Sequence, residues 1–204
     1  MSKYRKPLLE GKFYHVFNKG NNRENIFFEP GHYRLFIHKM GEFLPCCVDV
    51  YAYCLLPNHF HMLVRMKEKN EISEGSRLQQ ESKQMSIYSK AFQKFFTSYA
   101  TIINLKTGRK GSLMRKPFKR LFIGDVDYLR NLVFYIHANP QMHGIIDDFR
   151  MYPWSTYNRI ILGKPSKLKK QEVRTWFTND RNYLDFHARK VDLVELRTKF
   201  LELE

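Results

Sequence analysis

The strongest constraint on the fold comes from two apolar runs separated by a short break. The first run, Val48–Leu56, is β-branched, aromatic and uninterrupted, and the second, His59–Met66, begins directly after Pro57-Asn58. Such runs, bounded by a turn signal, are typical of β-strands. We therefore expect two central strands joined by a tight connection.

The flanking segments extend this pair into a series of strands and helices. Turn-forming or capping residues separate segments that have strand-like or helical periodicity. The further predicted elements are a strand at residues 13–17, a helix at residues 32–43, a helix from residue 84 to residue 106, a short strand at residues 121–123 and a helix at residues 126–139 after the N-cap Asp125. This order is typical of an α+β ferredoxin-like sandwich, with one antiparallel sheet and helices on one face.

The 204 residues are enough for one domain with an appendage. We expect residues 1–160 to form that domain and residues 161–204 to form a basic accessory C-terminal tail that contains helices. Residues 67–82 are predicted to be a mobile loop, because they have almost no apolar side chains.

The charge of the chain restricts the class of partner. The sequence has 35 Lys and Arg residues against 20 Asp and Glu residues, a formal net charge of +15. This exceeds what solubility requires and indicates a polyanionic partner, with nucleic acid as the first candidate. A basic protein that binds no polyanion is the alternative that charge alone leaves open.

The cysteines and the apolar segments indicate a cytoplasmic protein. Three cysteines, two of them adjacent, supply neither a disulfide framework nor a CxxC metal site. No apolar run suits a signal peptide or reaches the length needed to cross a bilayer. We expect no membrane contact, and association with the nucleoid when the protein is bound to DNA.

Two histidines in the second central strand are candidate metal ligands. His59 and His61 are two residues apart, so their side chains project from the same face of a strand and could approach one ion. Histidine pairs of this spacing more often serve as hydrogen-bonded strand residues. The pair alone does not decide between these interpretations.

A second polar pair lies on the last predicted helix. Tyr135 and Asn139 are one turn apart on a common face, opposite the apolar stripe of that helix, and are therefore aimed away from its core face. The alternative is a tyrosine packed at a sheet edge and an asparagine that ends the helix before Pro140. His137 lies on a different side, and we expect it at the surface or toward a partner.

These residues belong to two motifs in a fixed order, LPNHFH at residues 56–61 and YIHANP at residues 135–140. Further pieces follow in order at residues 17–23, 143–144 and 152–157. Together they resemble the signature of the IS200-like single-tyrosine HUH transposases. The resemblance is strongest to the REP-associated tyrosine transposases, in which an asparagine follows the tyrosine by four residues on the catalytic helix.

The resemblance implies a metal-dependent endonuclease and transposase for single-stranded DNA. On this basis His59, His61 and Asn139 are ligands of a divalent metal, Mg²⁺ or Mn²⁺, and Tyr135 is the nucleophile. The enzyme would nick and rejoin DNA near a hairpin or palindromic repeat through a 5′-phosphotyrosine intermediate. A homodimer and a monomer are both compatible with this family, and the general base for Tyr135 is not identified.

Two loops rich in amides or basic residues are candidate DNA contacts, because such groups bind phosphates. A solvated charged face is the alternative for any single lysine among them. The predicted DNA-binding residues are Asn18, Asn21, Asn22, Arg23, Arg109, Lys110, Arg115, Lys116, Lys119 and Arg120.

Two other functions fit the same residues. One is a non-catalytic nucleic-acid-binding module on the same fold, in which the histidines and the tyrosine only pack or bind a base. The other is a metal-dependent phosphodiesterase in which water attacks phosphorus and no covalent adduct forms. A covalent protein–DNA adduct distinguishes the transposase from both.

Overall fold

A four-stranded antiparallel sheet forms the centre of the computed structural model, which describes residues 6–73, 85–162 and 165–188. The spatial strand order is β2-β3-β1-β4. The strands are β1 (Phe13–Lys19), β2 (Val48–Leu56), β3 (His59–Met66) and β4 (Lys119–Ile123). The two central strands expected from the apolar runs are confirmed, and the tight connection between them contains only Pro57 and Asn58.

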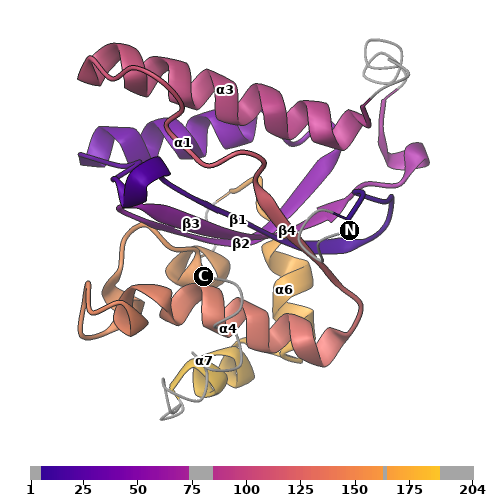
Figure 1. Ribbon diagram of the computed structural model, residues 1–204. Coiled ribbons are helices and arrows are strands. Elements are labelled where there is room, and N and C mark those ends of the chain that lie inside the picture. Colours follow the sequence, from indigo (N-terminus) through magenta and orange to yellow (C-terminus); the bar gives the residue numbers. More distant parts are fainter. Residues whose placement is uncertain (1–5, 74–84, 163–164, 189–204) are drawn as a thin grey trace.

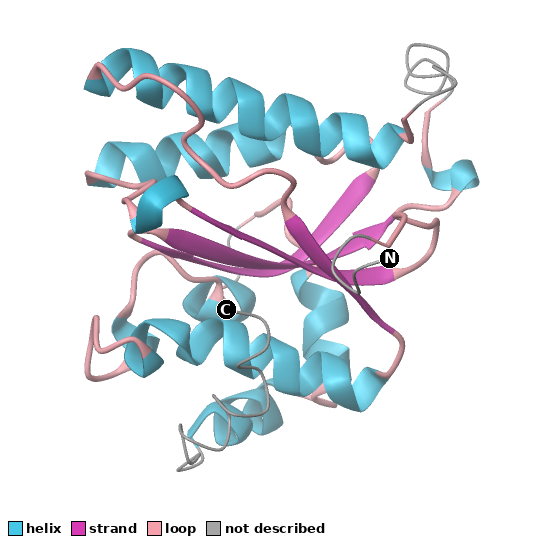
Figure 2. Cartoon of the chain, in the orientation of Figure 1, coloured by secondary structure: helices cyan, strands magenta, loops and turns pink. Residues whose placement is uncertain are grey.

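Helices cover both faces of this sheet (Figures 1 and 2). On one face lie α1 (Pro30–Phe43) and α3 (Ile87–Thr107). On the other lie α4 (Val126–Met142) and the short helices α5 (Tyr157–Ile161), α6 (Lys170–Trp176) and α7 (Asp180–Ala188). Three single-turn 3₁₀ helices, η2 (Asn21–Arg23), η3 (Lys69–Glu71) and η4 (Phe149–Met151), lie in connections.

The predicted α+β ferredoxin-like sandwich is confirmed, with one correction. The expectation of helices on one face holds for α1 and α3, whereas α4 and the helices after it lie on the opposite face. The reason is visible in β2, where every residue is buried. A strand whose two faces are both apolar needs a layer of side chains on each side.

The first hydrophobic core lies between the sheet and the α1/α3 layer. Its centre is Phe36, whose ring centroid lies 5.0 Å from that of Phe60 on β3 and 4.7 Å from that of Phe95 on α3. All three side chains are fully buried. Aromatic contacts across three elements therefore fix the distance between this helical layer and the sheet.

The second core surrounds α4, which is buried on two sides. Tyr135 and Asn139 are fully buried toward the sheet, and His137 is fully buried toward α7. His137 Nδ1 lies 3.0 Å from Nε2 of His187, and His137 Nε2 lies 2.9 Å from Oγ1 of Thr156. The expectations that His137 faces the surface and that Tyr135 and Asn139 point away from the core are thus wrong, because α7 covers the far side of α4.

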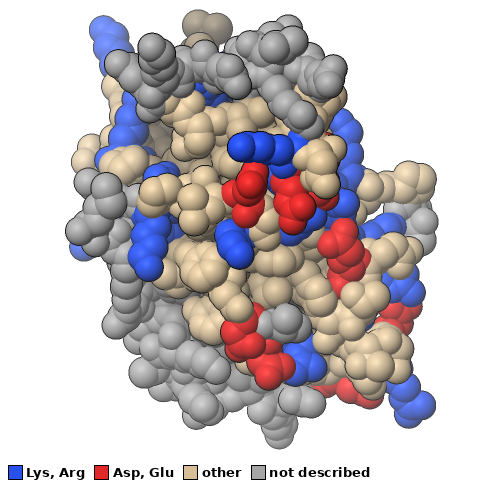
Figure 3. Space-filling model, turned by 90° about the vertical axis from the view of Figure 1, so that its right-hand side faces the viewer, with Lys and Arg blue, Asp and Glu red and all other residues tan. Residues whose placement is uncertain are grey.

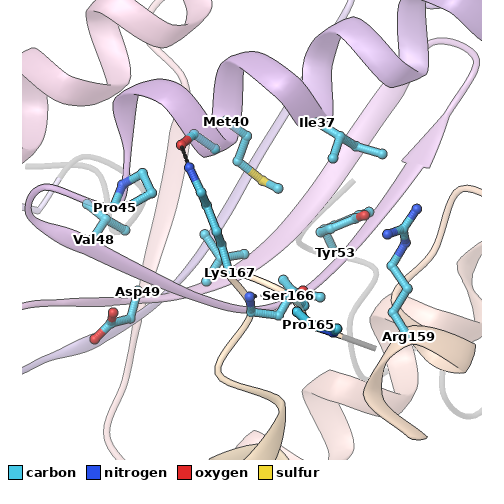
Figure 4. A pocket seen from close by; sticks show the side chains of 13 residues that line it. Ile37, Met40, Pro45, Val48, Asp49, Tyr53, Arg159, Pro165, Ser166 and Lys167 are labelled. Carbon is cyan, nitrogen blue, oxygen red and sulfur yellow. Dashed lines mark hydrogen bonds between the residues drawn. The ribbon is translucent and has the colours of Figure 1, made fainter. Parts of the chain in front are cut away.

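The edge of β2 is covered by the chain that follows α5. Lys169 N donates to Val50 O at 2.9 Å, and Leu168 forms a parallel bridge with Val50. Between α1, β2 and this segment lies a pocket of about 560 Å³, drawn in Figure 4. The side chain of Lys167 crosses it and donates to Gly41 O at 2.7 Å. The described part of the predicted tail is therefore packed against the sheet edge, which would otherwise be unpaired.

The predicted start of α4 is confirmed, and its predicted end is wrong. Asp125 caps α4 as predicted and accepts hydrogen bonds from Asp127 N and Tyr128 N. The same helix does not end at Asn139-Pro140 but continues to Met142, with Pro140 inside it. The predicted start of α3 at residue 84 and most of the predicted 67–82 loop lie outside the described residues. No helix in the described ranges is both long and apolar enough to span a bilayer.

We predict that Tyr183→Ala lowers the free energy of unfolding by about 3–5 kcal/mol, since a buried aromatic side chain and its packing are lost. Tyr183 on α7 is fully buried, and its hydroxyl donates to Tyr157 O at 3.1 Å. The control is the neighbouring Leu184→Ala, because Leu184 is 41% exposed; it should change stability by no more than about 0.5 kcal/mol. Urea denaturation measures both, and equal small effects would show that α7 does not stabilise the fold.

Candidate active site

The two motif histidines lie at the start of β3, close to the end of β1. In the β1–β3 ladder, His59 pairs with Lys19 and His61 pairs with Phe17. Their ring centroids are 5.2 Å apart, and their side chains lie on the α4 side of the sheet. Phe60, between them, points into the opposite core, so the alternation expected for a strand separates the site from the α1/α3 layer.

His59 is held by Asn58 and faces Asn139 on α4. His59 Nδ1 lies 2.6 Å from Asn58 Oδ1, which only accepts, so Nδ1 carries the proton and donates. The lone pair of a neutral His59 is then on Nε2, 3.2 Å from Asn139 Oδ1. Two acceptors at this distance suit two ligands of one cation. If the Asn139 amide were rotated so that Nδ2 faced His59, Nδ2 would donate an ordinary hydrogen bond to His59 Nε2. A metal titration distinguishes this hydrogen bond from a pair of metal ligands.

His61 is almost completely enclosed, as is Asn139. Its Nδ1 lies 2.9 Å from His15 Nε2 on β1, and both histidines are buried. Burial lowers the pKa of His61 well below its usual range and lowers the pKa of His15 to about 3, so both rings are neutral near pH 7. If His61 Nδ1 donates to His15, the lone pair of His61 lies on Nε2.

Several buried polar atoms at the site have no hydrogen-bond partner in the described part of the chain. They include His15 Nδ1, His61 Nε2 and Asn139 Nδ2. A buried polar atom normally has a partner, so His61 Nε2 is suited to a ligand that is not part of the chain. Imidazole nitrogens with an amide oxygen form a mixed donor set that accepts Mn²⁺ or Mg²⁺. No group of three His, Cys, Asp or Glu side chains in the described residues could by itself hold a metal ion, so the third donor of this candidate site is the Asn139 amide.

Tyr135 lies against the same histidines in the same chain. Its ring centroid is 5.4 Å from that of His61 and 6.1 Å from that of His15, both edge to face. Tyr135 is fully buried, whereas His59 is half-buried and lies beside the exposed His143 at 4.8 Å between ring centroids. The candidate ligands and Tyr135 are therefore brought together within one chain, and the exposed side of this group is at His59.

The structure adds two residues to the site that sequence reasoning missed. Asn58 was part of the LPNHFH motif, but nothing in the sequence indicated that it orients His59. His15 lies in the predicted first strand, and its contact with His61 follows from strand pairing that the sequence does not specify. The only available signal for Asn58 was its position directly before a candidate ligand.

The two predicted DNA-binding loops lie side by side. Gly20 forms an isolated bridge with Met114, and Arg115 N donates to Lys19 O at 3.0 Å. Asn18 Nδ2 donates to Arg115 O at 2.9 Å, and Asn21 Nδ2 donates to Ser112 O at 2.8 Å. The Asn18 and Asn21 amides thus join the two loops, so these predicted DNA contacts also have a structural role.

The other predicted DNA-binding side chains either interact with groups of the protein itself or are exposed to solvent. Arg109 forms an ion pair with Glu24, Arg120 donates to Lys6 O, and Lys119 lies over the Phe17 ring. The exposed group is Asn22, Arg23, Lys110, Arg115 and Lys116. On the face shown in Figure 3, acidic side chains lie among the basic ones, so the excess positive charge does not form a uniform basic surface there.

The chain is similar to known proteins in sequence and in fold. No family model matches the chain. Over 114 residues it is 25% identical to the "Putative REP-associated tyrosine transposase" of Haemophilus influenzae, a match that covers 54% of this chain and 60% of that relative. A solved structure of a REP-associated tyrosine transposase bound to a REP hairpin superposes with a TM-score of 0.60, at 20% identity over 79% of this chain and 86% of that one.

The chain resembles the REP-associated tyrosine transposases. The resemblance inferred from the two motifs is therefore confirmed by an independent sequence match and by a match in fold. The chain spans about 60% of the length of the curated relative. The REP-associated tyrosine transposases thus provide the framework in which the roles of the site residues are proposed.

We predict that Asn58→Ala weakens Mn²⁺ binding by about 10–100-fold, the usual effect of removing a group that orients a histidine ligand. Asn58→Asp keeps an oxygen that accepts from His59 Nδ1 and should retain most of the affinity. Isothermal titration calorimetry with Mn²⁺ measures both variants. Equal affinity of the wild type and Asn58→Ala would contradict a role for Asn58 in orienting a metal ligand.

Proposed function

We propose that the protein is a metal-dependent endonuclease and strand transferase for single-stranded DNA, with Tyr135 as the nucleophile. The observation that carries this proposal is the packing of Tyr135 against His61, beside the paired acceptors of His59 and Asn139. The similarity to the REP-associated tyrosine transposases supports the same reaction class. A tyrosine with no role in the reaction would not need to lie beside candidate metal ligands.

His59, His61 and Asn139 would hold the divalent ion. When bound, Mg²⁺ or Mn²⁺ would polarise the scissile phosphate and offset the negative charge of the transition state. Asn58 and His15 would keep the two histidine rings in orientation. Burial holds the pKa of His61 well below its usual range, so with His61 Nδ1 donating to His15 the Nε2 lone pair is available to the ion without prior loss of a proton.

Tyr135 would attack phosphorus in a transesterification. The bond from Tyr135 Oη to phosphorus forms as the bond from phosphorus to the 3′ oxygen breaks, which gives a 5′-phosphotyrosine and a 3′-hydroxyl. The tyrosine proton leaves as the new bond forms, and the 3′ oxygen gains a proton. Attack by another 3′-hydroxyl reverses the chemistry and rejoins a strand. Because Tyr135 is fully buried, its side chain must turn toward the open side at His59.

The substrate proposed is single-stranded DNA next to a hairpin or palindromic repeat. The solved relative was bound to a REP hairpin, and the present chain has a net charge of +15 to attract a polyanion. Phosphate contacts are assigned to the exposed loop residues Arg23, Lys110, Arg115 and Lys116. The contact of Tyr135 with His61 of its own chain supports a reaction carried out within one protomer.

We predict that Tyr135→Phe abolishes a covalent protein–DNA adduct, because the attacking oxygen is removed. The assay mixes protein, Mn²⁺ and labelled single-stranded DNA that carries a repeat hairpin, and it resolves adducts on a denaturing gel. The matched control is Tyr128→Phe, on the same helix and two turns earlier, which should retain the adduct. Metal-dependent cutting that survives Tyr135→Phe would instead establish a phosphodiesterase that uses water.

His59→Ala and metal removal test the remaining part of the proposal. Both should reduce adduct formation by at least about 100-fold, since the electrostatic stabilisation of the transition state is lost. Added Mn²⁺ should restore the chelated wild type but not His59→Ala. Undiminished adduct in EDTA would exclude a metal role, and binding without cutting on every hairpin tested would favour the non-catalytic module.

A further inference from the structure

A groove lies on the far side of the sheet from the active site, between α3 and the loop that leads to β4. Its volume is about 700 Å³. Figure 1 shows this loop running back along α1 and α3 toward β4. One wall is a single face of α3, with Ser89, Gln93, Thr97, Ala100 and Asn104 at spacings of three or four residues, and the other is formed by residues 111–118.

The groove combines the side chains that bind single-stranded nucleic acid. Phe96 and Phe118 are half-buried at its base, with ring centroids 5.4 Å apart. Arg115, Lys116 and Arg120 supply positive charge, and none of the described lining residues is acidic. Aromatic rings with cations beside them accommodate bases and phosphates in turn.

Asn104 gives the groove a means to distinguish bases. Its Nδ2 donates to Gly111 O at 2.8 Å, which fixes the amide. Its Oδ1 is buried and accepts no hydrogen bond from any residue in the described ranges. An exocyclic amine of adenine or cytosine could donate to this oxygen, whereas thymine has no such donor.

The groove and the active site meet at the end of β1. Asn18 lines the groove, and the next residue, Lys19, pairs with His59 in the ladder. Successive residues of a strand point to opposite faces. A DNA strand that passes the β1 end can therefore have one part at Tyr135 and a neighbouring part in the groove.

We propose that this groove binds unpaired bases of the DNA strand that is cut, and that it favours bases with an exocyclic amine. The inference rests on the proposed function, because it identifies where the same substrate is held beyond the scissile phosphate. Binding in the groove needs no chemistry at Tyr135. The two proposals can therefore fail separately.

The test fills the groove without changing charge. Thr97 is exposed on the groove face of α3, so Thr97→Trp should block it, while Leu105→Trp places the same ring on the same helix outside the groove. Both variants are made with Tyr135→Phe, and affinity for labelled oligo-dC and oligo-dT is measured by fluorescence anisotropy. Thr97→Trp should weaken oligo-dC binding by about tenfold or more, the size of one lost base stack, and Leu105→Trp should not.

The base preference provides a second, independent readout. With Thr97 and Leu105 unchanged, the Tyr135→Phe protein should bind oligo-dC more tightly than oligo-dT, and Thr97→Trp should remove that difference. Thermal unfolding of each variant shows whether a loss of binding reflects loss of fold. If Thr97→Trp is folded and binds oligo-dC as tightly as the Leu105→Trp control, the groove proposal is overturned.

The Thr97→Trp and Leu105→Trp variants are also tested for adduct formation in a protein that retains Tyr135. This assay separates the two proposals. Wild-type adduct together with unchanged binding by Thr97→Trp would overturn only the groove. Binding that depends on Thr97 without any wild-type adduct would overturn only the nuclease. Failure of the wild type to bind single-stranded DNA at all would overturn both.

Discussion

The pairing of β1 with β3 is the constraint on which the rest of the site depends. Its register sets Phe17 opposite His61 and brings His15 within hydrogen-bond distance of that ring. A shift by one residue would turn His61 toward the α1/α3 core and Phe60 toward α4. The register is stabilised from both sides, since Phe60 fills the aromatic core at Phe36 while Phe17 packs in the second core.

The α4 helix is fixed by a second set of contacts. The sheet covers its Tyr135 and Asn139 side, and α7 covers its His137 side through His187 and Tyr183. Burial lowers the pKa of His137 well below its usual range and that of His187 to about 4, so near pH 7 the contact is a hydrogen bond between uncharged rings. The position of the proposed nucleophile thus depends on a helix more than forty residues later in the chain.

The sequence was sufficient to predict those parts of the fold that depend on local patterns of residues. The strand pair β2/β3, the N-cap Asp125 and the order of elements follow from apolar runs and capping chemistry. The placement of α4 could not be predicted in this way. Both sides of that helix are buried, one by the sheet and the other by α7, and only the tertiary fold brings these elements together. His15 and Asn58 were missed for a similar reason, since neither the contact of His15 with His61 nor that of Asn58 with His59 leaves a pattern in the sequence.

The covered edge of β2 has a consequence for folding during synthesis. The backbone groups of Val50 and Tyr53 bond to Lys169 and Thr156, which the ribosome adds more than a hundred residues later. Until then β2 is paired only with β3 and presents an open edge to any other nascent chain. Translation of this chain in a crowded cell therefore carries an aggregation hazard that ends when the segments on both sides of α5 emerge and close the edge.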